Sequence, residues 1–230
     1  MAVGVDGCRG GWVVSADGRP IEFYPRFSEV LKQHEKKNIL VDIPQGLTDA
    51  TRSLDGHARQ IFNVHPSSIF PVPCRRAVYA SNYREACEIS YRKTGKKISR
   101  QAWNIGPKVR EVDKALRSDK ELQGYVYESH PEICFAVFKG NPMSFSKRKP
   151  EGIAERLDLL SGLDAGVRHR FSEALENFPR SLVTRDDIVD AMILEQAAKN
   201  FEIFQREKLV DSKGLAVRLA VPAHASEVKF

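Results

Sequence analysis

The sequence predicts a single α/β domain that opens with an antiparallel β-meander and carries a helical insertion. Short apolar runs bounded by turn residues open the chain, whereas helical spacing dominates its last third. The chain has 230 residues, of which 42% are hydrophobic, so one core can form without a disulfide or zinc staple. We therefore expect one domain over residues 1–230, with the insertion at about residues 64–120.

Turn residues bound the expected strands. Asp17 and Gly18 form a typical hairpin turn after the second apolar run, and Pro44 and Gly46 end the fourth run. The expected strands are residues 3–6, 11–15, 21–24, 38–43, 124–128 and 215–221.

Prolines and glycines divide the helical part of the chain. Pro66, Pro71 and Pro73 make the start of the insertion an ordered loop, and Gly106 with Pro107 is a possible break in a later helix. The expected helices are residues 27–34, 52–62, 81–93, 101–117, 131–138, 151–161, 165–177 and 186–206.

Composition excludes several classes of protein. The four cysteines are scattered and lack the paired spacing of a zinc cluster or a disulfide framework. No apolar run reaches the roughly 18 residues of a membrane span. Asp6 interrupts the apolar N-terminal stretch, and no basic region precedes it. We expect reduced thiols, no signal peptide, no membrane segment and a cytoplasmic location.

Positive charge is concentrated in the insertion. Residues 75–120 contain thirteen Lys or Arg against five acids, whereas residues 1–74 contain eight of each. Such a segment is typical of a surface that contacts phosphate, and it is equally typical of a solvated helical surface. Charge alone leaves both interpretations open.

Acidic residues occur where the predicted strands end. Asp6 follows the first apolar run, Asp42 follows Ile39 to Val41, and Glu128 follows Tyr125 to Tyr127. A carboxylate in such a place is costly to bury unless a cation or dense hydrogen bonding compensates for its lost hydration. For Asp42, capping of the turn at Pro44 is an equally good explanation.

A second group of acids opens the last long helix. Asp187 and Asp190 are three residues apart and share a face of that helix, whereas Asp186 points elsewhere. Acids in a first helical turn also favour the helix dipole, which is the structural explanation for Asp186 and Asp187. Asp190 lies beyond the first turn, so the dipole explains it less well.

Strand-end acids that converge with acids on a late helix predict a site for hard divalent cations. Two such ions about 4 Å apart can activate water and stabilise the leaving oxygen of a phosphodiester. The expected cofactor is Mg²⁺ or Mn²⁺. The expected metal ligands are Asp6, Asp42, Glu128, Asp187 and Asp190.

Several motifs together resemble one family. The motifs are GVDGCRGGW at 4–12, VDIPQGL at 41–47, LDGHARQ at 54–60, SSIFPVP at 67–73, ESHPE at 128–132 and DDIVDAM at 186–192. They are similar, in this order and over about residues 1–200, to the predicted RNase H-like nucleases of domain of unknown function family four hundred and twenty-nine. The resemblance implies an RNase H-like fold, a five-stranded mixed sheet with an antiparallel meander flanked by helices.

The resemblance also implies roles for the acids. Asp6 matches the first-strand aspartate of the RNase H-like superfamily, and Asp187 with Asp190 looks like the paired aspartates on the last core helix of Holliday-junction resolvases. Glu128 is similar to the acid after a middle strand in related resolvase-like proteins, whereas Asp42 has no clear counterpart. The catalytic residues implied are Asp6, Glu128, Asp187 and Asp190.

Basic residues near these motifs are candidates for substrate binding. Arg9 follows the first acid and is either a phosphate ligand or a turn residue. Lys108 lies in WNIGPKV, where Trp103 either stacks on a base or anchors the insertion. His130 either transfers protons or caps the helix that follows it. The candidate substrate ligands are Arg9, Arg75, Arg76 and Lys108, and the expected basic surface consists of Arg75, Arg76, Lys96, Lys97, Arg100 and Lys108.

Two classes of function follow from the sequence. The first is a nuclease that hydrolyses nucleic acid by a two-metal mechanism. The alternative is a nucleotide- or phosphate-binding protein on the same fold, either phosphotransferase-like or non-catalytic. No P-loop sequence GxxxxGK[ST] is present, and one domain leaves no room for the two-domain arrangement of sugar kinases and actin-like ATPases.

Overall fold

The computed structural model of the protein describes residues 1–65, 69, 71–223 and 225. Pro66 to Ser68 and Phe70 belong to the expected proline-rich loop and to the SSIFPVP motif, and they lie outside the described residues.

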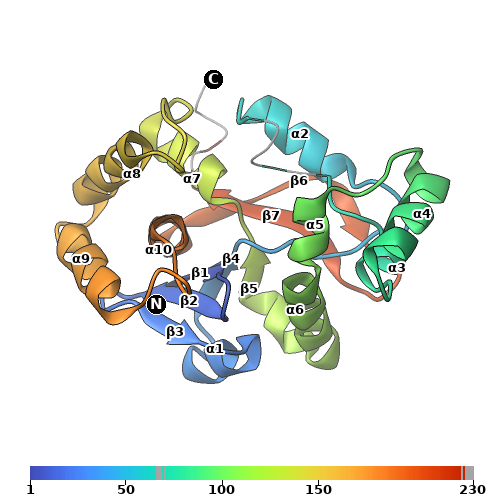
Figure 1. The fold of residues 1–230 in the computed structure, drawn as a ribbon, viewed down its shortest axis with the longest axis horizontal. Coiled ribbons are helices and arrows are strands. Elements are labelled where there is room, and N and C mark those ends of the chain that lie inside the picture. The colour runs from blue at the N-terminus through green and yellow to red at the C-terminus, as the bar shows by residue number, and fades with distance from the viewer. Residues whose placement is uncertain (66–68, 70, 224, 226–230) are drawn as a thin grey trace.

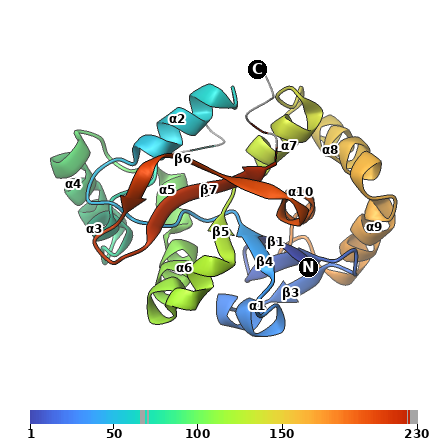
Figure 2. The same ribbon diagram turned by 180° about the vertical axis from the view of Figure 1, so that it is seen from behind.

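A five-stranded mixed sheet forms the centre of the molecule, in the strand order β3-β2-β1-β4-β5 (Figures 1 and 2). The first three strands are antiparallel neighbours, whereas β4 runs parallel to β1 and β5 runs parallel to β4. This is the RNase H-like arrangement that the sequence predicts. The strands are β1 (Ala2–Gly7), β2 (Trp12–Ala16), β3 (Glu22–Tyr24), β4 (Asn38–Val41) and β5 (Val126–Glu128).

The predicted hairpin turn after β2 is confirmed. Asp17 and Gly18 have φ angles of 51° and 71°, and the amide of Arg19 donates to the carbonyl of Ala16 at 3.0 Å. Two successive positive φ angles are what a type I′ turn requires, and Asp-Gly adopts them at low cost.

Helices cover both faces of the sheet. They are α1 (Phe27–Gln33), α2 (Ser53–Ile61), α3 (Arg75–Val78), α4 (Tyr83–Thr94), α5 (Arg100–Asn104), α6 (Gly106–Ser118), α7 (Pro131–Lys139), α8 (Pro150–Leu163), α9 (Val167–Asn177) and α10 (Arg185–Lys199), with a 3₁₀ turn η1 (Lys120–Gly124). The predicted break before Pro107 separates α5 from α6.

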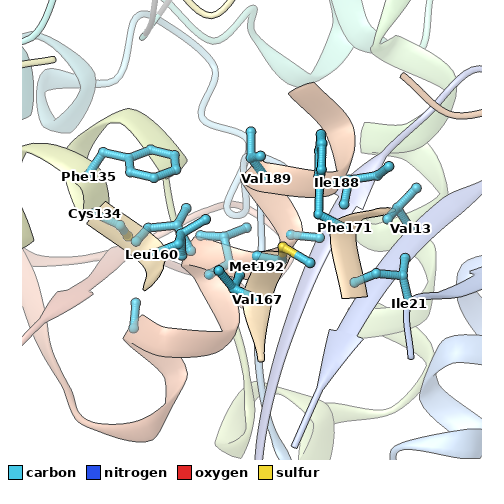
Figure 3. Close-up of a cluster of buried hydrophobic side chains, with 14 of the residues drawn as sticks. Val13, Ile21, Cys134, Phe135, Leu160, Val167, Phe171, Ile188, Val189 and Met192 are labelled. Carbon is cyan, nitrogen blue, oxygen red and sulfur yellow. The ribbon is translucent and has the colours of Figure 1, made fainter. Parts of the chain in front are cut away.

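The side chains of β1 alternate between two cores, as strand geometry requires. Val3 and Val5 pack with α1 and α6, whereas Ala2 contributes to the core on the α10 side. Figure 3 shows that second core, in which Ile188 and Met192 of α10 lie among side chains from α7, α8, α9 and the sheet. Sequence alternation along β1 therefore decides which residues face α10.

The expected insertion consists of two different parts. Val109, Val112 and Leu116 of α6 are buried against the sheet, so α6 is a layer of the main core. The helices α3 and α4 have a small core of their own that includes Ala77 and Cys87. Trp103 packs against this small core, as expected for a residue that anchors the insertion.

One expected helix is too long. The last helix was expected to reach residue 206, but α10 ends at Lys199 and residues Phe201–Val210 form strand β6. Strand β6 pairs antiparallel with β7 (Ala216–Pro222), which confirms the expected terminal strand. The hairpin packs on α2 and α7, and this burial selects the extended conformation over the helical spacing of the sequence.

Within the described part of the chain, the helices are too short or too polar to cross a membrane.

Candidate functional site

The side of the sheet that faces α10 carries the first acid of the site. A methyl group added to Gly4 would lie 2.0 Å from the carbonyl oxygen of Ala191, so only glycine permits this close contact between β1 and α10. Asp6 is two residues beyond Gly4 and shares its face. Asp6 therefore lies against the part of α10 that carries Asp190, and both residues line one pocket.

Asp42 joins Asp6 because β1 and β4 are parallel and in register. Val5 is paired with Val41, and the amide of Asp42 donates to the carbonyl of Val5 at 3.1 Å. Leu40 packs in the α10 core, so Asp42, two residues further, also faces that side. His130, 8% exposed, places its Nδ1 3.2 Å from a carboxylate oxygen of Asp42. The side chain of His130 thus contacts an acid of the pocket.

Asp190 is only 1% exposed, and its two carboxylate oxygens have different surroundings. Oδ2 accepts a hydrogen bond from the ammonium of Lys147, whereas Oδ1 is buried and has no hydrogen-bond partner among the described residues. Burial raises the pKa of Asp190 to about 7, and Lys147 opposes this rise. A buried carboxylate oxygen without a donor is costly, so it marks a place where a cation or a proton is missing.

Asp6 is affected by the same surroundings. Burial, followed by the repulsion of Asp190 and Asp42, raises the pKa of Asp6 well above its usual value. The negative charges of Asp190 and Asp42 therefore make the ionisation of Asp6 less favourable. A bound cation is most stabilising where carboxylates repel one another in this way.

The pocket has a volume of about 630 Å³ and contains charges of both signs. Its acids are Asp6, Asp42, Glu132 and Asp190. Its cations are Lys108, Lys147, Arg148 and Arg156. Arg156 is bound to both oxygens of Glu132, at 2.7 and 2.8 Å, so this pair neutralises itself.

Glu128 belongs to the other face of the sheet. It is paired in register with Val41, a residue of the α6-side core, rather than with Asp42. Its carboxylate is fully buried and binds Arg52 at 2.6 and 2.9 Å, and it accepts the amide of Gln45 at 2.7 Å. Successive side chains of a strand point to opposite faces, and Glu128 is aligned with Val41, one residue before Asp42. The side chain of Glu128 therefore points away from the face that carries Asp6 and Asp190.

Asp187 lies at the edge of the site and caps α10. Its carboxylate accepts the amide of Thr184 at 2.7 Å, and the hydroxyl of Thr184 accepts the amide of Asp187, which forms a capping box. Burial raises the pKa of Asp187 despite this hydrogen bond, and the charge of Asp187 helps to raise the pKa of Asp6. The structural explanation from the helix terminus thus holds for Asp187, which remains near the pocket.

Arg75 does not belong to an exposed basic surface. Its guanidinium is buried and binds Asp113 at 2.8 Å and Asp211 at 2.5 Å. Arg76, the next residue, is exposed. The helical phase of α3 therefore places two adjacent arginines, both expected to contact substrate, in opposite environments.

Other expected substrate ligands are distributed over the surface and the pocket. Arg9, Lys96, Lys97 and Arg100 are exposed. Lys108 lines the pocket, where its ammonium lies 4.3 Å from the centre of the Trp12 ring and donates to the carbonyl of Gly11. Burial lowers the pKa of Lys108.

Sequence reasoning missed Lys147 and Arg52. The segment SKRKP at 146–150 contains three consecutive basic residues just before α8, and this was a signal that the pocket has a basic edge. Arg52 gave no comparable signal, because a lone arginine before a helix is ordinarily exposed.

The pocket offers few protein ligands for a metal ion. Across residues 1–65, 69, 71–223 and 225, no three His, Cys, Asp or Glu side chains lie close enough to form a ready-made metal cluster. Mg²⁺ commonly binds one or two protein carboxylates and keeps several of its waters. The carboxylates of Asp6 and Asp190 therefore suit Mg²⁺ better than an ion that needs a closed cage of protein ligands.

Comparison with known proteins gives one result. A family model described as “Protein of unknown function (DUF429)” matches residues 4–211, which is the family that the motifs indicate. No curated protein and no solved structure matches the chain.

Proposed function

We propose that this chain, which belongs to the DUF429 family of proteins of unknown function, is a divalent-metal-dependent nuclease that hydrolyses phosphodiester bonds. The observation that carries the proposal is the pair of buried acids, Asp6 on β1 and Asp190 on α10, that face one pocket from different elements. The unpartnered Oδ1 of Asp190 adds a second reason to place a cation there.

Carboxylates of Asp6 and Asp190 would hold the cation, and Asp42 lies close enough to raise the pKa of Asp6. When bound, Mg²⁺ or Mn²⁺ supplies Lewis acidity to a phosphoryl oxygen and lowers the pKa of water. His130 contacts Asp42 and Glu128, at 3.2 and 3.6 Å, and so fixes the position of Asp42 relative to the sheet.

The basic side chains around the pocket support phosphate as the ligand. Lys108 and Arg148 line the pocket, and no ion pair to a carboxylate is found for either within the described residues. These groups could bind the phosphates that flank a scissile bond, while the acids face the bond itself. Arg76, Lys96 and Lys97 are exposed and could bind further phosphates outside the pocket.

Cleavage of labelled nucleic acid tests the proposal. The full chain should cleave at least one member of a panel of single-stranded, duplex, hybrid and junction substrates of DNA and RNA when Mg²⁺ or Mn²⁺ is present. Asp6→Asn keeps the side-chain shape but removes the charge that holds the cation, so it should reduce cleavage at least 100-fold, about 2.7 kcal/mol in the barrier. Asp49→Asn, a change at an exposed acid, should leave cleavage unchanged.

Two outcomes would contradict the nuclease proposal. One is cleavage by Asp6→Asn at the wild-type rate, and the other is wild-type cleavage in excess chelator.

A nucleotide-binding protein is the second candidate, and the size of the pocket favours it. A volume of about 630 Å³ is in the range of small-molecule sites. Calorimetric titration with nucleoside mono-, di- and triphosphates distinguishes the two candidates. Micromolar binding of a free nucleotide by a chain that cleaves none of the oligonucleotides would favour the second candidate.

A further inference from the structure

We propose that Lys147 is a fixed cation of the acidic pocket and takes the place of one of two metal ions, so that the site binds a single divalent cation. This inference rests on the proposed function and changes the expected number of ions from two to one.

Lys147 contacts the acid that a second ion would need. Its ammonium donates to Oδ2 of Asp190, and its side chain is 32% exposed whereas that of Asp190 is 2% exposed. The ammonium therefore reaches a buried carboxylate from the open side of the pocket. Among the charges around it, those of Asp190 and Asp6 favour the ammonium most strongly.

The loop that carries Lys147 is fixed to α8 by two consecutive residues of that helix. Glu155 accepts the amides of Ser144 and Phe145, at 2.9 and 3.0 Å, and also binds Lys139 at 2.6 Å. Arg156 donates to the carbonyl of Phe145 at 3.1 Å. The loop is thereby held two residues before Lys147.

A glycine in α8 completes this arrangement. A methyl group on Gly152 would lie 2.0 Å from the carbonyl oxygen of Ser146, so the loop contacts the helix where only glycine fits. Because Ser146 directly precedes Lys147, the backbone position of the lysine is set by the fold. A lysine that approached Asp190 by chance from a free loop would not need these contacts.

The second oxygen of Asp190 indicates how many cations remain to be bound. Oδ1 is buried without a partner among the described residues, although Oδ2 is already neutralised by Lys147. Asp190 can thus contact two cations at once, and the lysine supplies only one of them.

The balance of charge also favours one ion. Arg156 neutralises Glu132, and His130 contacts Asp42. Asp6 and Asp190 remain, with Lys147 bound to Asp190 and with Lys108 and Arg148 also in the lining of the pocket. A second divalent ion beside these cations would add two more uncompensated positive charges to a partly buried site.

Counting bound Mn²⁺ tests this inference without nucleic acid. Mn²⁺ is titrated into the full chain, and the free ion is followed by its electron paramagnetic resonance signal. The wild-type chain should bind one Mn²⁺. Lys147→Met keeps most of the aliphatic stem but removes the charge, and it should bind two.

Two further variants serve as controls. Lys149→Ala removes the same charge from an exposed position of the same loop and should bind one ion. Lys147→Arg keeps a cation next to Asp190 and should also bind one ion, even if Lys147→Met fails to fold.

The outcomes separate this inference from the proposed function. Two ions on a wild-type chain that cleaves nucleic acid would overturn the role of Lys147 and leave the nuclease standing. An unchanged single ion on folded Lys147→Met would likewise overturn it. A wild-type chain that binds no Mn²⁺ would overturn both proposals.

Discussion

The acidic pocket and the network around Arg52 contain the same kind of group, buried carboxylates on strands of the sheet and on helices, but the two regions neutralise these carboxylates in different ways. Arg52 binds Asp55 at 2.9 Å, Glu128 at 2.6 Å and the carbonyl of Gln45 at 2.6 Å, and it is 2% exposed. Each acid of that network has a guanidinium partner. In the pocket, the ammonium of Lys147 binds Asp190 and only influences Asp6 through its charge, and Asp190 retains an unpartnered oxygen.

This difference separates structural acids from functional ones. A buried carboxylate with full hydrogen bonding stabilises one arrangement of the chain and has no capacity left for a ligand. A buried carboxylate that lacks a partner lowers the stability of the folded state. Such carboxylates are found mainly at functional sites, where the group binds a ligand or takes part in a reaction. Burial alone does not distinguish the two, because Glu128 and Asp190 are both almost fully buried.

The largest effect is expected in the paired region. Arg52→Met should reduce the free energy of unfolding by about 3–5 kcal/mol, because it leaves Asp55 and Glu128 buried without their partner. Urea unfolding followed by circular dichroism measures this loss. Arg84→Met removes an exposed arginine that pairs with Glu88 and should change stability by less than about 1 kcal/mol. Equal losses for the two variants would remove the distinction between the regions.

Two adjacent arginines provide a smaller effect of the same kind. Arg75→Ala should cost about 2 kcal/mol in unfolding experiments, because Asp113 and Asp211 lose a partner but keep other hydrogen bonds. Arg76→Ala should leave stability unchanged.

The exposed arginine should instead affect nucleic-acid binding. Arg76→Ala should lower the slope of log affinity against log salt by at most about 0.9 units, the contribution of one phosphate contact. Fluorescence anisotropy with a labelled oligonucleotide at several salt concentrations measures it. Binding that does not depend on salt would show that this basic surface is only solvated.

The smallest effect on stability is expected for Asp6→Asn, and the sign of this effect changes when a metal ion is bound. The folded state holds the Asp6 proton to higher pH than the unfolded chain, so ionisation lowers the stability of the wild type as the pH rises above about 4. Asp6→Asn should therefore be more stable than the wild type at pH 7 by about 1 kcal/mol without metal, and this advantage should vanish near pH 4.

Addition of Mn²⁺ should raise the Tm of the wild type but not that of Asp6→Asn. Differential scanning calorimetry at pH 4 and 7, with and without Mn²⁺, gives all of these values. An Asp6→Asn chain that is less stable than the wild type at pH 7 without metal would show that Asp6 is a structural acid.

Local sequence signals were sufficient for much of the fold. The Asp17-Gly18 turn, the apolar run that became β4 and the break before Pro107 each depend on the conformational limits of single residues. Strand β6 was not predictable in this way, because Phe201 and Phe204 have a spacing that also suits a helix. Its pairing with β7 and its packing on α2 decide the conformation, and both are contacts between distant parts of the chain.

The candidate site was predictable in part for a related reason. Asp6 and Asp190 were identified because each interrupts an apolar segment, and the structure places both in the pocket. Glu128 has the same local signal, but its register with Val41 turns it to the other face. A register between strand residues that are 87 positions apart in sequence has no local signature, and neither has the ion pair that brings Lys147 to Asp190.

The central claim is that buried acids without a full set of partners bind a cation, whereas buried acids paired with arginine stabilise the fold. Crystals soaked in Mn²⁺ test this claim most directly. Anomalous scattering should locate the ion within about 2.0–2.6 Å of carboxylate oxygens of Asp6 and Asp190, with Glu128 still bound to Arg52. A Mn²⁺ ion on Glu128, or a pocket without Mn²⁺ at saturating concentration, would contradict the claim.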